Sequence, residues 1–97
     1  AVKTYTLEVD ISQAIRRRIA ELAMALHRDA NALGDDDVIP HMGLLDSASL
    51  IDLVVWLETE FGILLQHDEI TVQNLGTVRA MTQFVWARTA GGRAQRT

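Results

Sequence analysis

The chain has 97 residues, of which 48% are apolar and 23% are charged, and it contains no cysteine. These values predict one small soluble domain, and they exclude disulfides, thiolate metal sites and a cysteine nucleophile. No apolar run approaches the roughly 18 residues that a membrane-spanning helix needs, and the start of the chain lacks the features of a secretory signal. A chain without cysteine fits a reducing compartment, and we expect a cytoplasmic monomer without a membrane span.

The acidic residues are concentrated in the middle of the chain. Ten of the 13 lie between Asp29 and Glu69, a stretch without Lys or Arg, although the net charge of the whole chain is only −4. Binding of nucleic acid needs a basic patch, so nucleic acid is not expected as a partner. The distribution favours basic protein partners, and a solvated acidic surface without a partner is the alternative.

The first half of the chain predicts one helix and a long connection. Residues 1–9 alternate weakly and are expected to form an extended tail. Asp10 has the character of an N-cap, with Gln13 as its capping-box partner. The helix that follows is predicted to run to about Arg28 on an apolar stripe of Ile11, Ile15, Ile19, Leu22 and Leu26. Residues 29–46 are predicted to be a long loop, because Gly, Asp and Pro interrupt any periodicity there, although several apolar residues in it must be buried.

The second half predicts a helix over residues 47–61 that is ended by Gly62. One face of this helix is a core stripe, and a second apolar face is formed by Ala48, Ile51 and Val55. One helical turn is expected near residues 67–70, and a last main helix, capped by Asn74 or Thr77, is expected to end at about Arg88. The fold class is therefore all-α: a small four-helix bundle of three main helices and one short helix, with a long first loop. Residues 10–89 are the expected domain, and residues 90–97 are an expected disordered tail.

The segment of residues 43–63 carries the chemistry. Ser47 is a hydroxyl at the predicted start of an amphipathic helix, directly after a flexible loop. The unpaired N–H groups and the positive end of the helix dipole would stabilise a phosphate ester on this side chain. Asp46 could cap the helix or orient an incoming group. For an isolated Asp-Ser pair, however, a helix cap and nothing more is the commoner interpretation.

The wider pattern resembles the acyl and peptidyl carrier protein family, whose attachment motif is a Gly-containing loop, an Asp-Ser pair and a helix that ends in an acidic residue and Phe. At the family's spacing, Asp46 and Ser47 are followed by Leu53, Leu57, Glu58, Glu60 and Phe61, and the resemblance covers about residues 11–85. The Gly-Leu-Leu-Asp-Ser form is closest to D-alanyl and other free-standing aminoacyl carriers. The resemblance implies a carrier and not an enzyme, with 4′-phosphopantetheine transferred from coenzyme A to Ser47, Asp46 as the orienting neighbour, and a cargo acid held as a thioester.

Two positions depart from the family's pattern. Ala48 stands where the family usually has Leu, and Ser49 stands where many fatty-acid carriers have an acid, so the acidic docking face is thinner. We expect a partly apolar partner surface, made of Ala48, Ile51, Asp52, Val55, Glu58 and Thr59.

The resemblance implies three kinds of partner: a phosphopantetheinyl transferase, an acyl- or aminoacyl-activating ligase, and downstream acyl-transfer enzymes. An amino acid is the first expectation for the cargo, and a polyketide or specialised fatty acyl group is the second. The tails on both sides favour a free-standing chain.

Two other functions are open. A helical adaptor would use the apolar face of Ala48, Ile51 and Val55, with Ser47 only as a helix cap. A small hydrolase using Ser47 lacks a convincing base and a Gly-x-Ser-x-Gly elbow. No metal site is expected, because the three aspartates of residues 35–37 lack the wider calcium-loop pattern.

Overall fold

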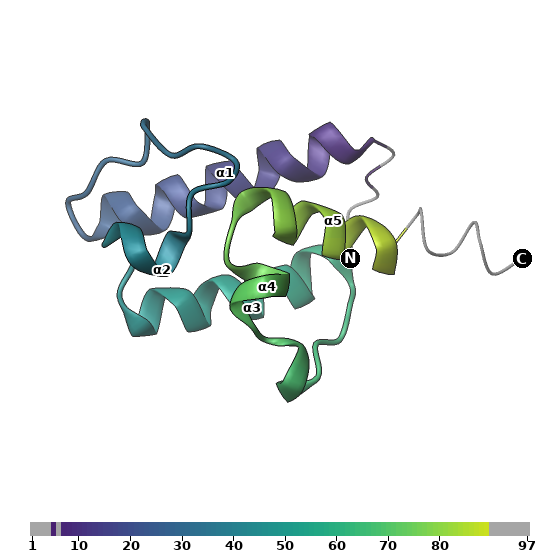
Figure 1. Cartoon of the computed structure of the whole chain (residues 1–97). Coiled ribbons are helices and arrows are strands. Elements are labelled where there is room, and N and C mark those ends of the chain that lie inside the picture. Colours follow the sequence, from purple (N-terminus) through teal and green to yellow (C-terminus); the bar gives the residue numbers. More distant parts are fainter. Residues whose placement is uncertain (1–4, 6, 90–97) are drawn as a thin grey trace, which may run out of the picture.

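The computed structural model describes residue 5 and residues 7–89. Three main helices form the fold: α1 (Glu8–Ala25), α3 (Ser47–Phe61) and α5 (Val78–Arg88) (Figure 1). Two one-turn helices, α2 (Ile39–Met42) and α4 (Val72–Leu75), and the 3-10 turn η1 (His67–Glu69) lie in the connections. The described residues contain no strand. The predicted all-α class and the three main helices are therefore confirmed, and the short helix expected near residues 67–70 is the turn η1.

The start of α1 differs from the prediction. Leu7 holds the N-cap position without a side-chain hydrogen bond, and its carbonyl accepts from the N–H groups of Asp10 and Ile11 at 3.1 and 3.4 Å. The prediction that Asp10 caps the helix is wrong. Glu8 and Asp10 stand inside the first turn, where their charges are favoured by the positive end of the helix dipole. Residues 8 and 9, which were expected in the tail, are helical, and residues 1–4 and 90–97 lie outside the described residues.

The end of α1 comes at Ala25, earlier than the predicted Arg28. His27 adopts a left-handed conformation (φ 59°), and the N–H of Arg28 bonds to the carbonyl of Ala23 at 2.9 Å. This conformation usually carries Gly at a helix C-terminus. The sequence has no Gly at this point, so the prediction continued the helix too far.

The core lies between the three main helices, with α1 packed mainly against α5. Most residues of the expected stripes are buried there: Ile11, Ile15, Ile19 and Leu22 of α1, Leu53, Leu57 and Phe61 of α3, and Val78, Met81 and Val85 of α5. Leu26, predicted as the last residue of the first stripe, follows the end of α1 and is only half-buried. Burying a side chain of this size contributes about 1.5–3 kcal/mol. The half-buried Trp56 packs edge-on against Phe61, with ring centroids 5.4 Å apart.

The long connection from α1 to α3 folds back alongside α1 and contains the turn of α2 (Figure 1). Pro40 stands in the first turn of α2, and Gly43 ends this helix in the left-handed region (φ 71°). The N–H of Ile39 bonds to the carbonyl of Gly76 at 2.8 Å and docks α2 on the end of α4. A side chain at Gly76 would not fit, because its Cβ would lie 2.4 Å from the carbonyl oxygen of Val72.

The connection from α3 to α5 is held by a series of caps. Gly62 (φ 65°) ends α3 as predicted. Thr71 caps α4 by accepting from the N–H of Asn74, and Thr77 caps α5 by accepting from the N–H of Ala80. Of the two candidate caps for the last helix, Asn74 and Thr77, the structure therefore shows Thr77 as the N-cap.

Candidate functional site

The approach to α3 places Ser47 at the first position of the helix. Leu44 and Leu45 are buried in the core and fix the chain just before it. Asp46 takes the N-cap position, and its side chain accepts a hydrogen bond from the N–H of Ser49 at 2.8 Å. The sequence allowed either Asp46 or Ser47 as the cap of this helix, and in the structure Asp46 is the cap.

The Ser47 side chain is exposed, and its hydroxyl makes no hydrogen bond to the residues that the structure describes. The N–H groups of Ser47 and Ala48 likewise find no acceptor in this part of the chain. They stand at the start of a 15-residue helix, where the dipole is positive. A phosphodiester on the Ser47 oxygen would lie beside these donors, so the residues present fit such a group.

Asp46 is held as a carboxylate by the same helix start. The hydrogen bond from the N–H of Ser49 is the main cause that lowers the pKa of Asp46, followed by a bond from the Ser49 hydroxyl. The charge of Arg28 lowers the pKa of Asp46 further. Its cap is therefore strongest in the ionised form.

The expected partner surface lies on the outer face of α3. Ile51 and Val55 are 63% and 52% exposed, and Ala48, Asp52 and Thr59 are exposed as well. Glu58 differs from these residues, because its carboxylate accepts a hydrogen bond from the N–H of Leu65 at 2.9 Å. Glu58 therefore fastens the segment after α3, and a contact of Glu58 with a partner stays a prediction.

A groove runs beside this face that the sequence did not indicate. It has a volume of about 230 Å³ and is lined by five apolar side chains, Leu50, Ile51, Val54, Val55 and Ile70. The first four come from α3, while Ile70 comes from the segment between η1 and α4. The exposed Val72 follows as the first residue of α4. The only sequence signal for this wall was two apolar residues without periodicity in a mixed segment.

An apolar cavity of about 190 Å³, partly open to solvent, adjoins the groove and lies between α2, α3, α4 and α5. Leu50, Leu53, Val54 and Leu57 of α3 form one side of it. The other sides are formed by Pro40, Ile70, Thr71, Val72, Leu75, Gly76 and Met81. The first α3 residue of its lining, Leu50, follows Ser47 by about one helical turn.

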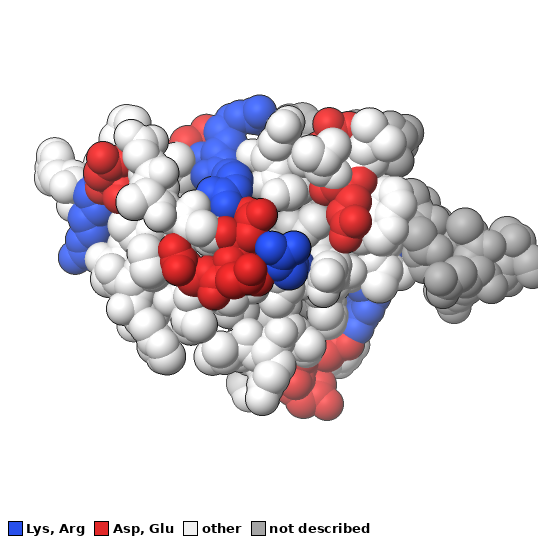
Figure 2. Space-filling model, turned by 45° about the horizontal axis from the view of Figure 1, so that its top comes forward, with Lys and Arg blue, Asp and Glu red and all other residues white. Residues whose placement is uncertain are grey.

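Two aspartates of the long connection, Asp35 and Asp36, are bound to arginines. Arg79 donates to Asp36 through Nε and Nη2 at 2.7 and 3.1 Å, and Arg16 forms an ion pair with Asp35. Asp37 accepts from the N–H of Gly34 at 2.7 Å. Figure 2 shows acidic and basic side chains in contact on one face of the molecule. These carboxylates fasten the loop, and the described residues contain no group of three or more His, Cys, Asp or Glu that could hold a metal ion.

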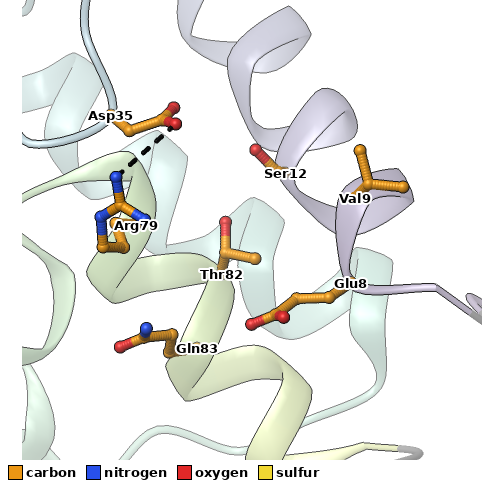
Figure 3. A pocket seen from close by; sticks show the side chains of 7 residues that line it. All are labelled: Glu8, Val9, Ser12, Asp35, Arg79, Thr82 and Gln83. Atoms are coloured by element: carbon orange, nitrogen blue, oxygen red, sulfur yellow. Dashed lines mark ion pairs between the residues drawn. The ribbon is translucent and has the colours of Figure 1, made fainter.

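A polar pocket of about 270 Å³ lies between α1 and α5 (Figure 3). Its wall combines the side chains of Glu8 and Ser12 with those of Thr82 and Gln83. At one end, Nη2 of Arg79 lies 4.0 Å from Oδ2 of Asp35. The seven residues of its lining include no histidine. Neither Ser12 in this pocket nor Ser47 on α3 has a hydrogen-bonded base among the described residues, which argues against a hydrolase.

Comparison with known proteins gives one match. A family model described as a phosphopantetheine attachment site matches residues 13–85. Neither the curated proteins nor the solved structures give a match. In the described part of the chain, no helix combines the length and apolar character that crossing a membrane requires.

Proposed function

The chain belongs to the family of phosphopantetheine attachment domains, which are carriers without catalytic activity and bear a covalent 4′-phosphopantetheine, and we propose that Ser47 receives this group. The observation that carries the proposal is the exposed Ser47 hydroxyl at the start of α3, which is not used by the fold. Asp46 supports it by capping the helix in place of Ser47.

The Ser47 oxygen forms a bond to the phosphorus that bears the pantetheine in coenzyme A. The bond from this phosphorus to the adenosine bisphosphate leaving group breaks, and the hydroxyl proton passes to a base that the transferase supplies. The N–H groups at the start of α3 stabilise the negative charge of the product. Once attached, the arm supplies a thiol, which this cysteine-free chain lacks, and a cargo acid is held on it as a thioester.

Intact mass before and after incubation with coenzyme A and a broad-specificity phosphopantetheinyl transferase tests the attachment site. We expect a gain of one phosphopantetheinyl unit for the native chain and no gain for Ser47→Ala. Ser49→Ala is the matched control, because it removes the next hydroxyl of the same helix and should retain the gain. Because Asp46 makes the cap, the free energy of unfolding of Ser47→Ala should differ from that of the native chain by no more than about 0.5 kcal/mol. A mass gain in Ser47→Ala would refute the proposal.

The adaptor alternative loses part of its support on α3. It needs Ser47 to serve only as a helix cap, whereas the cap bond to Ser49 comes from the Asp46 side chain. If the native chain is folded, starts without the arm and still gains no mass, the adaptor becomes the favoured function.

The cavity bears on the cargo. Its wall is formed almost entirely by apolar residues, about half of them from α3 and α4, and an ammonium group placed there would lose its hydration without a partner. We therefore propose an apolar acyl cargo ahead of the amino acid that the motif first suggested. Hydroxylamine should cleave an octanoyl thioester more slowly on the carrier than on coenzyme A, whereas an alanyl thioester should be cleaved at similar rates on both, because only the octanoyl chain is drawn into the cavity. Equal octanoyl rates on the carrier and on coenzyme A would remove this preference.

The groove beside α3 is the proposed docking surface for the transferase and the acyl-handling enzymes. Its lining is apolar, Asp46 and Asp52 are exposed at the start and on the surface of α3, and Asp68 is exposed on η1. The sequence has no Lys or Arg from residue 29 to residue 78. The partner that fits is a protein surface with a protruding apolar side chain flanked by Lys or Arg.

Val55→Glu tests this surface by placing a charge in the groove. We expect kcat/KM for arm transfer by the transferase to fall on the order of tenfold, as for loss of an interface anchor. Gln73→Glu is the control, because it makes the same charge change at an exposed position on α4 outside the groove. An unchanged rate for Val55→Glu, with Ser47 still modified, would refute the docking surface and leave the attachment site intact.

A further inference from the structure

Attachment of the arm puts two negative charges side by side at the start of α3. Asp46 is held there as a carboxylate, mainly by the hydrogen bond that it accepts from the N–H of Ser49. The phosphodiester on Ser47 adds a second full charge at the next residue. The N-terminus of a helix offers only about half an elementary positive charge, which does not offset both. A cation near Ser47 would therefore stabilise the modified chain.

The sequence offers one cation for this place. Arg28 is the only Lys or Arg from residue 19 to residue 78. It follows the end of α1, and Figure 1 shows the end of α1 and the start of α3 at the same end of the molecule. The Arg28 side chain is exposed, and its charge acts on the Asp46 carboxylate. Arg28 thus combines the right charge with a position beside the attachment site.

The backbone turn at His27 is what brings Arg28 to this position. His27 is left-handed (φ 59°), and its N–H bonds to the carbonyl of Met24 at 2.9 Å, while the N–H of Arg28 bonds to the carbonyl of Ala23 at 2.9 Å. This pair of bonds is the Schellman motif, in which the position of Arg28 commonly carries an apolar residue that packs back on the helix. An exposed arginine stands there instead, and His replaces the usual Gly. Left-handed residues other than Gly are concentrated at functional sites.

The guanidinium of Arg28 is not used by the fold. In the part of the chain that the structure describes, it makes no hydrogen bond or ion-pair contact. Asp29, the adjacent acid, accepts from the N–H of Asn31 at 2.9 Å. Arg16 and Arg79, by contrast, are paired with aspartates of the long connection. An uncommitted guanidinium can bind phosphate through two parallel N–H donors.

We propose that Arg28 is a positioning residue for the arm, and that its guanidinium binds the phosphate of the ester on Ser47 beside the N–H groups of Ser47 and Ala48. This inference rests on the proposed function, since it takes Ser47 for the attachment site. Before attachment, the Asp46 carboxylate attracts Arg28 to this place, and the phosphate then shares it. Arg28 thereby restrains the first part of the arm, while the pantetheine beyond the phosphate stays free.

NMR of the native chain with and without the arm tests this contact directly. The Nε–H resonance of Arg28 should shift when Ser47 is loaded. The Nε–H resonance of Arg17 should not, because Arg17 lines a pocket with Glu60 at the other end of α3. An Arg28 resonance that does not respond to the arm would overturn the proposal.

The ³¹P resonance of the attached phosphodiester gives a second readout, which a purely structural role of Arg28 would not move. Arg28→Gln should shift this resonance, and Arg17→Gln, the matched loss of charge, should leave it in place. Arg28→Lys should restore the native resonance in part, because Lys keeps the charge and loses the paired donors. Added salt should reduce the difference between Arg28→Gln and the native chain, since salt screens exposed charges.

Failure of this inference differs from failure of the proposed function. A native chain that gains no mass with the transferase overturns the proposed function and, with it, the role of Arg28. A chain that gains the arm on Ser47 while its ³¹P resonance is the same in Arg28→Gln overturns the role of Arg28 alone.

Discussion

At the scale of single residues, Tyr5 shows that the domain extends further towards the N-terminus than its first helix. Its ring packs against Phe61 at the end of α3, with centroids 4.9 Å apart, and its hydroxyl donates to the Glu60 carboxylate at 2.6 Å. The sequence placed this residue in an extended tail, because a lone alternating segment has no partner that local periodicity could reveal. Its partners are more than 50 residues away, so only the folded chain brings them together.

Tyr5 is the only tyrosine of the chain, which makes its titration directly observable. Burial, followed by the hydrogen bond to Glu60, raises the pKa of Tyr5 to about 12 from its ordinary value of 10.0. A raised pKa means that the protonated phenol stabilises the fold; this contribution is complete below pH 10.0 and is lost as the pH rises through about 12. Alkaline spectrophotometric titration should give that midpoint. Glu60→Gln should lower it but keep it above 10.0, because burial remains. A native midpoint near 10.0 would show that the contact does not form in solution.

At the scale of elements, the stability of α3 depends on its cap. The bond from the N–H of Ser49 lowers the pKa of Asp46, so the ionised cap stabilises the fold above the ordinary Asp pKa of about 3.9 and is lost as the pH falls through the lower folded value. Asp46→Ala removes the acceptor, whereas Asn is as good an N-cap residue as Asp. At neutral pH we expect Asp46→Ala to lower Tm and Asp46→Asn to stay close to the native Tm. Thermal unfolding followed by circular dichroism measures both. An unchanged Tm in Asp46→Ala would show that the cap bond contributes nothing.

The sequence predicted α3 correctly because its signals are local. The apolar stripe that ends in Phe61 continues over the whole helix, and Gly62 follows directly. In the sequence, Pro40 and Gly43 indicate only a break in helical periodicity. In the structure they stand at the start and the end of α2, the positions that Pro and Gly prefer around a helix. A helix of four residues has too few positions for periodicity to show.

The groove, by contrast, could not be predicted from the pattern of α3. Ile51 and Val55 indicated an apolar face, but the opposite wall, Ile70, follows a Gly-terminated helix and an irregular segment. The position of Ile70 depends on the contacts of Glu58, Asn74 and Arg88, which join separate elements. Glu58 illustrates the same point. Its place on the helix wheel assigned it to the partner surface, and only the structure shows its carboxylate bonded to Leu65.

At the scale of the whole molecule, the acidic middle of the sequence is divided between two uses. The aspartates of residues 35–37 are taken up by Arg16, Arg79 and a backbone N–H, and they tie the long connection to α1 and α5. The carboxylates of Asp46, Asp52 and Asp68 stay exposed near α3 and the groove. These exposed carboxylates therefore remain available to attract a basic partner surface.

The clamp between the long connection and α5 predicts a small loss of stability in acid. The hydrogen bonds from Arg79 lower the pKa of Asp36, and the same contact raises the pKa of Arg79, so both partners favour the charged pair. A lowered carboxyl pKa stabilises the fold above the ordinary Asp pKa of about 3.9 and loses its effect as the pH falls through the folded value. The N–H of Arg79 also bonds to the Asp35 carbonyl at 3.0 Å, so the backbone contact holds the loop when the side-chain pair is lost.

Asp36→Asn should therefore lower Tm slightly at neutral pH, because exposed pairs contribute little, and the difference from the native chain should vanish below the folded pKa of Asp36. Added salt at neutral pH should reduce the same difference, because salt screens exposed charges. Asp52→Asn is the control: it removes an exposed carboxylate of α3 that lies outside the clamp, and its difference from the native chain should not follow the same course. Tm measured from about pH 7 to pH 3, at low and high salt, separates the two variants. If Asp36→Asn matches the native Tm throughout, the pair of Asp36 and Arg79 adds nothing measurable to stability, and the loop is held by its other bonds and its buried leucines.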